Sequence, residues 1–220
     1  MLISFETQRW AVGDSLIAGI DEVGRGCLAG PVVTAVVILN KDHFLSSLET
    51  LRNNDISYET FWAYDRIKDS KLLSAKNRAV LSEIIKKNAI EYNICEISNS
   101  QIDTLGITRA CQRGFEQNIS ALKSIPDHVF IDAFKIKSFP ENKQTNIIKG
   151  DNKSITIAAA SIIGKVYRDN KMIEFSKKFP EFEFDVHKGY GTKKHLEAIK
   201  SFGICEIHRK SFEPIKSLFK

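Results

Sequence analysis

Four acidic residues in this 220-residue sequence lie at or near the ends of short apolar runs, where core strands would end. They are Asp21, Glu22, Asp132 and Asp151. Buried carboxylates are costly unless they are neutralised, and Mg²⁺ or Mn²⁺, which prefer oxygen ligands, would neutralise them. Two such ions about 4 Å apart could activate water and stabilise the leaving oxygen of a phosphodiester. The pattern therefore predicts metal-dependent phosphodiester chemistry.

A glycine-rich turn, Gly24-Arg25-Gly26, separates the first acidic pair from a second apolar run. Glycine lets a backbone approach a ligand closely, although a surface hairpin with a charged tip is the commoner origin of an isolated Asp-Glu pair. Successive strand side chains face opposite sides of a sheet, so Asp21 and Glu22 cannot both reach one site from a regular strand. Either the strand twists at the turn, or one of the two acts through its backbone carbonyl or at longer range. Asp21 is the stronger candidate.

Apolar runs bounded by turns predict the elements that must position these residues. Residues 16–23 and 31–39 are expected to pair as antiparallel strands, and the second is so continuously apolar that both its faces should be covered. Ser74 can cap a helix over 75–87, which leads directly into a strand at 89–97.

The second half of the chain alternates helices and strands. Apolar spacing predicts a helix over 102–122, although two internal glycines interrupt its pattern. A long, alanine-rich helix over 154–178 is expected to be buried, and Thr192 can cap a further helix over 193–202. Antiparallel strands followed by helix–strand alternation indicate an α/β fold with a mixed sheet.

The composition is that of a globular chain, with 43% hydrophobic residues. No run approaches the roughly 18 apolar residues that a membrane span needs, and no charged leader precedes an apolar stretch. The four cysteines lie far apart and form no Cys-x-x-Cys pair, so neither a disulfide framework nor a zinc site is expected. These features predict a cytoplasmic protein with reduced thiols and no membrane association.

The net charge is +5, but it is unevenly distributed. Residues 1–134 carry 14 Lys and Arg against 17 Asp and Glu, giving −3, whereas residues 135–220 carry 18 against 10, giving +8. A basic C-terminal part would suit a polyanion, because lysines and arginines release condensed counterions when they neutralise phosphates. A solvated lysine-rich surface explains the charge equally well.

Seven stretches, in this order, resemble bacterial ribonuclease HII, the type 2 ribonuclease H family, across nearly the whole of residues 16–214. They are 18–26 together with 28–33, then 69–71, the strand ending at Asp132, 149–151, 157–169, 187–192 and 208–212. Each motif alone is modest evidence, but their joint occurrence in this order is highly specific.

The resemblance implies a role for each of the four acidic residues. In the family pattern Asp21, Glu22, Asp132 and Asp151 are the active-site residues that bind the metal ions. Two divalent ions, Mg²⁺ or Mn²⁺, are implied during catalysis. The resemblance thus supplies the same chemistry that the residue types themselves indicate.

Five further positions match substrate-contacting residues of the family: Gly24, Arg25, Gly26, Lys71 and Tyr190. The glycine turn is implied to contact the ribonucleotide and its phosphate through backbone groups, which suits a 2′-hydroxyl that both donates and accepts hydrogen bonds. Tyr190 is implied to stack on the sugar beside the scissile junction, and Lys71 to contact a phosphate. A lone Gly-x-Gly is more often plain hairpin geometry, and a lone lysine is usually just solvated.

Other polar residues are expected to have ordinary roles. His187 and His195 have no partners at zinc spacing, so loop and helix-surface positions are expected. Asp169 is expected to form an ion pair within its helix that organises Arg168. Arg209 is expected either to touch backbone phosphates or to be solvated.

Three positions depart from the family pattern: Leu72 stands where a second lysine is frequent, Ala133 where glycine is common, and Gly164 where alanine is usual. None of them removes a proposed ligand. Gly164 is expected to loosen the long helix slightly.

The resemblance implies one RNase H-like catalytic domain over residues 1–220, with a mixed sheet flanked by helices. Its core is expected at about 16–180, and a C-terminal helical, substrate-contacting extension at about 181–220. The implied monomer is a metal-dependent endoribonuclease that hydrolyses the phosphodiester 5′ to a ribonucleotide, leaving 3′-hydroxyl and 5′-phosphate ends. RNA–DNA hybrids and duplex DNA with single embedded ribonucleotides are the implied substrates, and ribonucleotide removal from DNA the implied role.

Two alternatives compete with this reading. The sister ribonuclease HIII, which handles single ribonucleotides poorly, is disfavoured because only about 15 residues precede the first expected strand. A catalytically silent nucleic-acid-binding domain is disfavoured because all four acidic residues are retained. The C-terminal residues 215–220 are too weak a motif to predict docking to a sliding clamp.

Overall fold

The computed structural model describes residues 4–42, 74–132 and 134–219. Three positions singled out in the sequence, Lys71, Leu72 and Ala133, lie outside these ranges. None of the helices in the described ranges is both long and apolar enough to cross a membrane.

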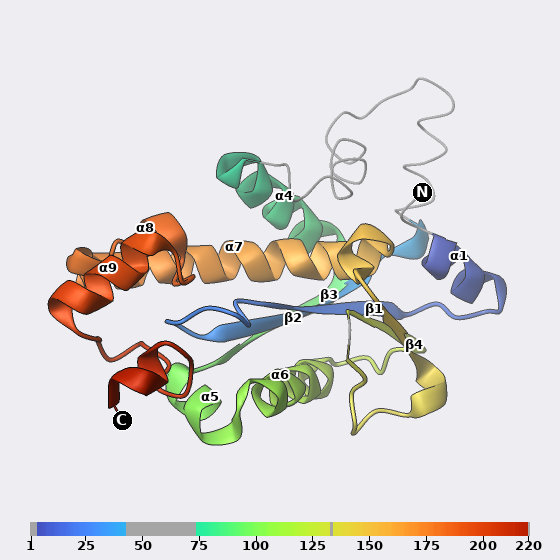
Figure 1. Cartoon of the computed structure of the whole chain (residues 1–220). Coiled ribbons are helices and arrows are strands. Elements are labelled where there is room, and N and C mark those ends of the chain that lie inside the picture. Colours follow the sequence, from blue (N-terminus) through green and yellow to red (C-terminus); the bar gives the residue numbers. More distant parts are fainter. Residues whose placement is uncertain (1–3, 43–73, 133, 220) are drawn as a thin grey trace.

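A five-stranded mixed sheet forms the centre of the molecule (Figure 1). Its order is β3-β2-β1-β4-β5, with β1 to β3 antiparallel and β4 and β5 parallel to β1. The strands are β1 (Ile17–Val23), β2 (Val32–Leu39), β3 (Ala89–Ile97), β4 (His128–Asp132) and β5 (Gln144–Ile147). Every residue of β2 is buried, as its continuous apolar sequence predicts, because helices cover both faces of the sheet.

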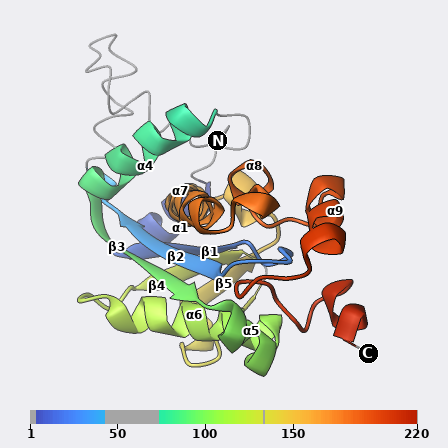
Figure 2. The same ribbon diagram turned by 90° about the vertical axis from the view of Figure 1, so that its left-hand side faces the viewer.

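Helices α7 (Ile155–Lys178) and α4 (Ala75–Asn88) cover one face of the sheet (Figure 2). The Ser154 hydroxyl accepts a hydrogen bond from the backbone N–H of Ile157 and so caps α7, while Ser74 caps α4 in the same way. Small side chains at Ala158 to Ala160 are fully buried and let α7 pack closely on β1 and β2. These helices confirm the sequence-based expectation.

The opposite face is covered by α5 (Asn99–Leu105) and α6 (Ile107–Ala121). The prediction of one helix over 102–122 is therefore wrong. Gly106 has a φ of 76°, which a right-handed helix does not allow, so it ends α5 and begins α6 in a new direction.

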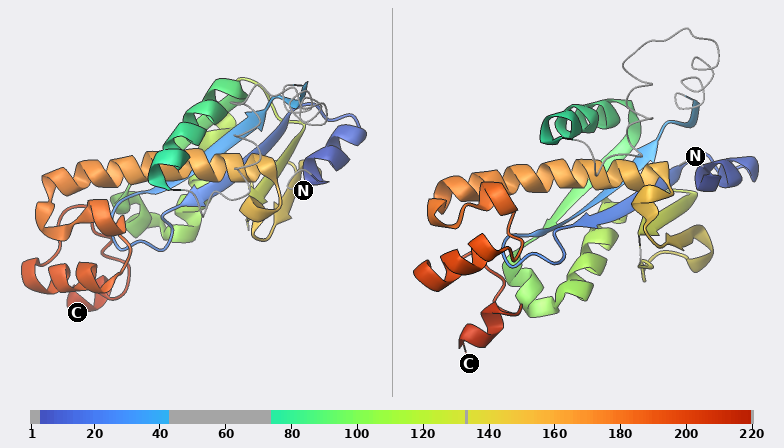
Figure 3. Two further views of the ribbon diagram at one scale, coloured as in Figure 1. Left: turned by 90° about the horizontal axis from the view of Figure 1, so that it is seen from above. Right: turned by 45° about the horizontal axis from the view of Figure 1, so that its top comes forward.

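The C-terminal part forms a helical extension beyond one end of α7 (Figure 3). It contains α8 (Phe184–His187) and α9 (Lys193–Phe202), which Thr192 caps and Gly203 ends as predicted. A separate apolar cluster holds this extension against the main body, with Met172 of α7 packed among its aromatic and aliphatic residues. At the other end of the molecule lies α1 (Ser4–Ala11).

Short 3₁₀ helices complete the described chain. They are η1 (Glu141–Lys143), η2 (Gly150–Asn152), η3 (Pro180–Phe182) and η4 (Ile215–Phe219). The side chain of Ile215 is fully buried in the C-terminal apolar cluster, so η4 packs onto the extension.

Candidate active site

All four predicted acidic residues border one pocket of about 790 Å³. Asp21 and Glu22 come from the end of β1, and Asp132 from the end of β4. Because β1 and β4 are neighbouring parallel strands, their carboxyl ends meet at the same edge of the sheet. Asp151 reaches the pocket differently, since β5 ends at Ile147 and Asp151 lies in the following turn η2.

Asp21 is more deeply buried than Glu22 and Asp132, the other two acids at strand ends, with 8% of its surface exposed. Its Oδ1 accepts a hydrogen bond from the backbone N–H of Glu22 at 2.8 Å, and the hydroxyl of Ser161 on α7 also donates to it. Burial, followed by the nearby charge of Glu22, holds the pKa of Asp21 well above its usual range, and Asp132 adds to the rise. The carboxylate therefore lies where negative charge is in excess.

Glu22 lines the same pocket as Asp21, although strand geometry directs the two side chains to opposite faces. Its Oε1 lies 3.6 Å from Nη1 of Arg25, and its Oε2 is buried without a hydrogen-bond partner among the described residues. Burial raises the pKa of Glu22 to about 7, with Arg25 opposing the rise and Asp132 adding to it. Both neighbouring acids thus lie where burial disfavours the charged form of a carboxylate.

The donor set fits a hard divalent cation. The acids offer only carboxylate oxygens, and one of these, Oε2 of Glu22, is buried and unpaired within the described part of the chain. In that same part no three His, Cys, Asp or Glu side chains are gathered closely enough to enclose an ion on their own. Carboxylate oxygens, water and substrate phosphate are the ligands that Mg²⁺ prefers.

Two buried arginines shape the glycine turn beside the acids. Arg209 donates hydrogen bonds to the carbonyl oxygens of Gly24 at 2.7 Å, Arg25 at 2.8 Å and Gly30 at 2.9 Å. Gly24 has a φ of 86°, and a Cβ there would lie 1.9 Å from Nε of Arg168. The expectation that Arg209 touches phosphates or solvent is wrong, because its side chain is fully buried and its donors are used by the turn.

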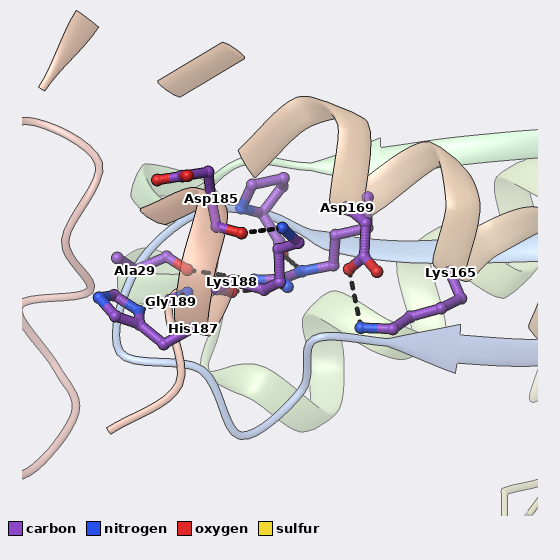
Figure 4. Close-up of polar contacts among 9 residues, drawn as sticks. Ala29, Lys165, Asp169, Asp185, His187, Lys188 and Gly189 are labelled. Carbon is purple, nitrogen blue, oxygen red and sulfur yellow. Dashed lines mark hydrogen bonds and ion pairs between the residues drawn. The ribbon is translucent and has the colours of Figure 1, made fainter. Parts of the chain in front are cut away.

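Arg168 joins the glycine turn to the loop that carries Tyr190. It donates to the carbonyl oxygens of Ala29, Pro31 and Lys188 at 3.2, 3.0 and 2.9 Å. The expectation that Asp169 organises this arginine is wrong: Asp169 pairs instead with Lys165 at 2.7 Å (Figure 4). Backbone carbonyls, rather than a carboxylate, satisfy the buried guanidinium.

Tyr190 lies at the mouth of the pocket, with 42% of its surface exposed. Its loop is fastened to the segment just after the glycine turn, because the carbonyl of Gly189 accepts hydrogen bonds from the backbone N–H groups of Leu28 at 2.8 Å and Ala29 at 3.3 Å. The hydroxyl of Tyr190 also hydrogen-bonds the thiol of Cys27. The two predicted substrate-contacting segments are therefore joined by hydrogen bonds and line the same pocket.

The predicted helix-surface position of His195 is wrong, and His187, expected in a loop, is the last residue of α8. His195 is fully buried and His187 nearly so, both against aromatic rings of the C-terminal cluster. Backbone groups satisfy the hydrogen-bonding atoms of both buried rings.

Seven residues to which the sequence assigned no role in the site also line the pocket: Val23, Arg78, Ile148, Lys149, Ser161, Ile162 and Lys165. Ser161 and Lys165 are four residues apart on α7, so both face the site from one side of the helix. That spacing from a buried helix was the available signal. Arg78 comes from α4, and nothing in its local sequence indicates the pocket.

Solved structures with the same architecture define the class. The chain matches ribonuclease H2 from Pyrococcus horikoshii OT3 with a TM-score of 0.70 at 23% identity, over 92% of this chain and 96% of that one. It also matches Bst-RNase HIII in complex with Mn²⁺, with a TM-score of 0.65 at 17% identity, over 94% and 70% of the two chains. The fold is that of the type 2 ribonucleases H.

Sequence comparison then gives the family. The model of the ribonuclease HII family matches residues 18–215. Ribonuclease HII from Staphylococcus epidermidis (strain ATCC 12228 / FDA PCI 1200) is 47% identical over 207 residues, which cover 94% of this chain and 73% of that protein. The chain belongs to the ribonuclease HII family of hydrolytic endonucleases.

Proposed function

We propose that the protein is a metal-dependent endoribonuclease that hydrolyses the phosphodiester 5′ to a ribonucleotide, leaving 3′-hydroxyl and 5′-phosphate ends. Its substrates would be RNA–DNA hybrids and DNA duplexes that contain single ribonucleotides, and its role the removal of ribonucleotides from DNA. One observation carries the proposal: the pocket that holds the four carboxylates is walled by the glycine turn and by Tyr190.

The carboxylates of Asp21, Glu22, Asp132 and Asp151 would hold the divalent ions, Mg²⁺ or Mn²⁺. When bound, such ions polarise the scissile phosphate and activate water. The raised pKa values of Asp21 and Glu22 support this assignment, because clustered, desolvated carboxylates lack a compensating cation. The Mn²⁺ complex of Bst-RNase HIII, which shares the fold, is consistent with it.

The glycine turn would recognise the ribonucleotide. Arg209 holds the carbonyls of Gly24 and Arg25 inward, which fixes the backbone that faces the pocket. A Cβ at Gly26 would meet nothing within 4 Å among the described residues, so a sugar can approach this backbone closely. A 2′-hydroxyl both donates and accepts hydrogen bonds, which lets backbone groups distinguish ribose from deoxyribose.

Cations around the carboxylates would position the nucleic-acid backbone. Arg25, Arg78, Lys149 and Lys165 all line the pocket. Phosphate contacts of this kind fix the register of a duplex without reading its sequence. Lys71 stays a predicted phosphate contact, and Tyr190 would lie against the sugar that follows the ribonucleotide.

The experiment that tests the proposal uses three labelled duplexes: one with a single ribonucleotide, one uniform RNA–DNA hybrid and one of DNA alone. Each is incubated with the wild-type protein and with Asp132→Asn, in Mg²⁺, in Mn²⁺ and in chelator, and the product ends are mapped. Cleavage 5′ to the ribonucleotide, dependent on metal and lost in Asp132→Asn, is expected for the first two duplexes.

Other outcomes point to the two alternative functions. Cleavage of the uniform hybrid without cleavage at the single ribonucleotide would indicate the specificity of ribonuclease HIII. Binding of duplex without any metal-dependent cleavage would mean that the scaffold only binds nucleic acid. A sliding-clamp partner is not proposed, because η4 packs its Ile215 into the C-terminal cluster.

A further inference from the structure

Three buried histidines lie directly behind the loop that carries Tyr190. His187 is at the start of this loop, His195 is on α9, and His208 is in the segment that follows α9. The exposed fractions of their side chains are 7%, 0% and 0%. None of them borders the carboxylate pocket, so the proposed chemistry does not use them directly.

The hydrogen bonds of His208 fix where its proton lies. Its Nδ1 is 2.9 Å from the backbone N–H of Cys205, which can only donate, and a longer contact of 3.3 Å joins the same atom to the Cys205 carbonyl. Nδ1 is therefore the acceptor, and the neutral ring carries its proton on Nε2. That Nε2 lies 3.1 Å from Nε2 of His195.

His195 extends this series of hydrogen bonds towards Tyr190. Because its Nε2 accepts from His208, its own proton lies on Nδ1, which is 2.9 Å from the carbonyl oxygen of Tyr190. The same carbonyl accepts from the backbone N–H of Thr192 at 2.8 Å. Both lone pairs of the Tyr190 carbonyl are thus engaged, one of them by a histidine whose tautomer is set by its neighbour.

His187 braces the other side of the loop. Its Nδ1 accepts from the backbone N–H of Gly189 at 3.2 Å (Figure 4), and its Nε2 donates to the carbonyl of Phe182 at 2.7 Å. The rings of His187 and His195 stack at 4.4 Å with an interplanar angle of 15°. Two neutral rings stack favourably, whereas two charged rings at this separation would repel each other.

We propose that His195 and His208 are positioning residues, which fix Tyr190 through a directed chain of hydrogen bonds from Cys205 N–H to the Tyr190 carbonyl. The proposal rests on the proposed function only in taking Tyr190 as a substrate contact. The two histidine tautomers and the conformational order of the Tyr190 loop can be measured whether or not the protein has any activity.

The surroundings keep the chain neutral. Burial lowers the pKa of His195 and of His208 to about 4, and aromatic rings of Phe182 and Phe184 enclose them. The charged or titratable side chains that face the cluster are Glu181, Glu183, Asp185, Lys188, Cys205 and Glu206. The acidic side chains among them shift the pKa values of His187 and Cys205. The hydrogen-bonded pair of His208 and His195 therefore carries no permanent charge.

The first test reads the tautomers directly. In the whole protein labelled with ¹⁵N-histidine, NMR at pH 7 is expected to show His208 as the Nε2–H form and His195 as the Nδ1–H form, both neutral. His187 is expected as Nε2–H. A His195 signal of the Nε2–H form, or of a charged ring, would overturn the proposal whether or not the protein cuts nucleic acid.

The second test compares substitutions at His195. His195→Asn places an amide donor near the position of Nδ1, whereas His195→Leu keeps a similar volume and removes the donor. His128→Leu is the matched control, because His128 is another buried histidine, bonded to Thr145 at the opposite end of β4 from Asp132. Hydrogen exchange of the 188–191 amides is expected to accelerate about tenfold in His195→Leu and much less in the other two.

A double-mutant cycle separates positioning from general damage. If His195 acts through Tyr190, His195→Leu should lower kcat/KM on the single-ribonucleotide duplex in the wild-type background and add nothing in Tyr190→Ala. Equal losses in both backgrounds would overturn the proposal. An inactive wild-type protein would refute the proposed function instead, and the exchange and NMR results would still decide this inference.

Discussion

Asp21 and Glu22 are consecutive residues of β1, and both side chains border one pocket although a strand directs them to opposite faces of the sheet. Asp21 is bonded by Ser161 of α7, on one face, while Glu22 lies towards Arg25 and towards Cys111 of α6, on the other. Burial raises the pKa of the Cys111 thiol, and the charge of Glu22 adds to the rise. The pocket therefore wraps around the end of β1. The charge of Asp132, on the neighbouring strand β4, adds to the rise in the pKa of both carboxylates. Asp132 is therefore close enough to interact with each of them.

This arrangement predicts opposite effects of Asp132→Asn on activity and on stability. Cleavage should fall at least about a hundredfold, because a bound metal supplies several kcal/mol of transition-state stabilisation and 1.36 kcal/mol is a factor of ten. The Tm of the metal-free protein should instead rise by about 2–4 °C, since a like charge beside Asp21 and Glu22 is removed. Thermal unfolding in chelator checks the rise, and a fall in Tm would show that the three carboxylates do not repel one another.

The two glycines of the turn should respond differently to alanine. In Gly24→Ala the new Cβ would meet Arg168, which three carbonyls hold in place, and the backbone would keep an unfavourable positive φ. A loss of about 2–4 kcal/mol in the free energy of unfolding is expected. In Gly26→Ala the new Cβ would meet none of the described residues within 4 Å, and the unfolding free energy should stay within about 0.5 kcal/mol.

The cleavage activity of Gly26→Ala tests whether the substrate approaches the turn at this residue. If a ribose approaches the backbone at this residue, the added methyl group should lower kcat/KM on the single-ribonucleotide duplex at least tenfold in a fully stable protein. Urea unfolding and initial rates measured on the same preparation provide both numbers. Unchanged kinetics would show that the turn contacts the substrate elsewhere.

Most helices and strands could be predicted from the sequence, because the residues that start, end and bury each element lie within that element or next to it. Apolar runs gave the strands, and the caps Ser74, Ser154 and Thr192 gave the starts of their helices. The acids could be expected to converge because each lies at or near the end of an apolar run, but the parallel pairing of β1 with β4 that brings Asp21 and Asp132 to one edge is seen only in the structure. The break at Gly106 was visible only as a weakened pattern, since a glycine inside a helix and one that ends it look alike in sequence.

The supporting structure behind the site could not be predicted in this way. Arginine and histidine are mostly exposed or half-exposed in proteins, so a surface role was the reasonable expectation for Arg209 and His195. Their burial depends on partners far away in the chain: Arg209 bonds the carbonyl of Gly24, and His195 bonds His208. Only the folded structure brings these acceptors and donors together.

Replacing Gly164 with alanine should stabilise the protein. It lies inside α7, where glycine costs about 1 kcal/mol relative to alanine. A Cβ there would lie 3.4 Å from side-chain atoms of Ala35 and Val23, at the tight end of ordinary contact. Gly164→Ala is therefore expected to raise the free energy of unfolding by about 0.5–1 kcal/mol without changing kcat/KM. Urea titration checks this, and a loss of stability would mean that β1 and β2 cannot yield to the methyl group.

The buried histidines predict acid sensitivity. The pKa values of His195 and His208 are about 4 in the folded protein, against an ordinary value of 6.5. Between these values the unfolded chain binds more protons than the folded one, so stability falls as pH drops from about 6.5 to 4 and is unaffected by these groups above pH 7. Each histidine can contribute up to about 3 kcal/mol of this loss.

Variants separate this histidine effect from the titration of carboxylates. The free energy of unfolding, measured in urea at several pH values, should fall less steeply between pH 6.5 and 4 in His195→Leu than in the wild type. The comparison is of slopes, so the stability that the variant itself loses does not matter. Parallel slopes would show that the ring of His195 is already charged in the folded protein at these pH values.

Glu6 should anchor α1 to the start of α7 through its hydrogen bonds rather than its charge. Its Oε1 accepts from the hydroxyl of Ser154 at 2.5 Å, and from the backbone N–H and hydroxyl of Thr156 at 3.1 and 2.9 Å. The side chain is fully buried, and burial raises its pKa. Glu6→Ala leaves buried donors unsatisfied and should cost about 2–4 kcal/mol, whereas Glu6→Gln keeps an acceptor oxygen and should cost less than about 1 kcal/mol. Urea unfolding at pH 7 measures both, and an equal loss in the two variants would show that the carboxylate charge at the helix N-terminus is the stabilising feature.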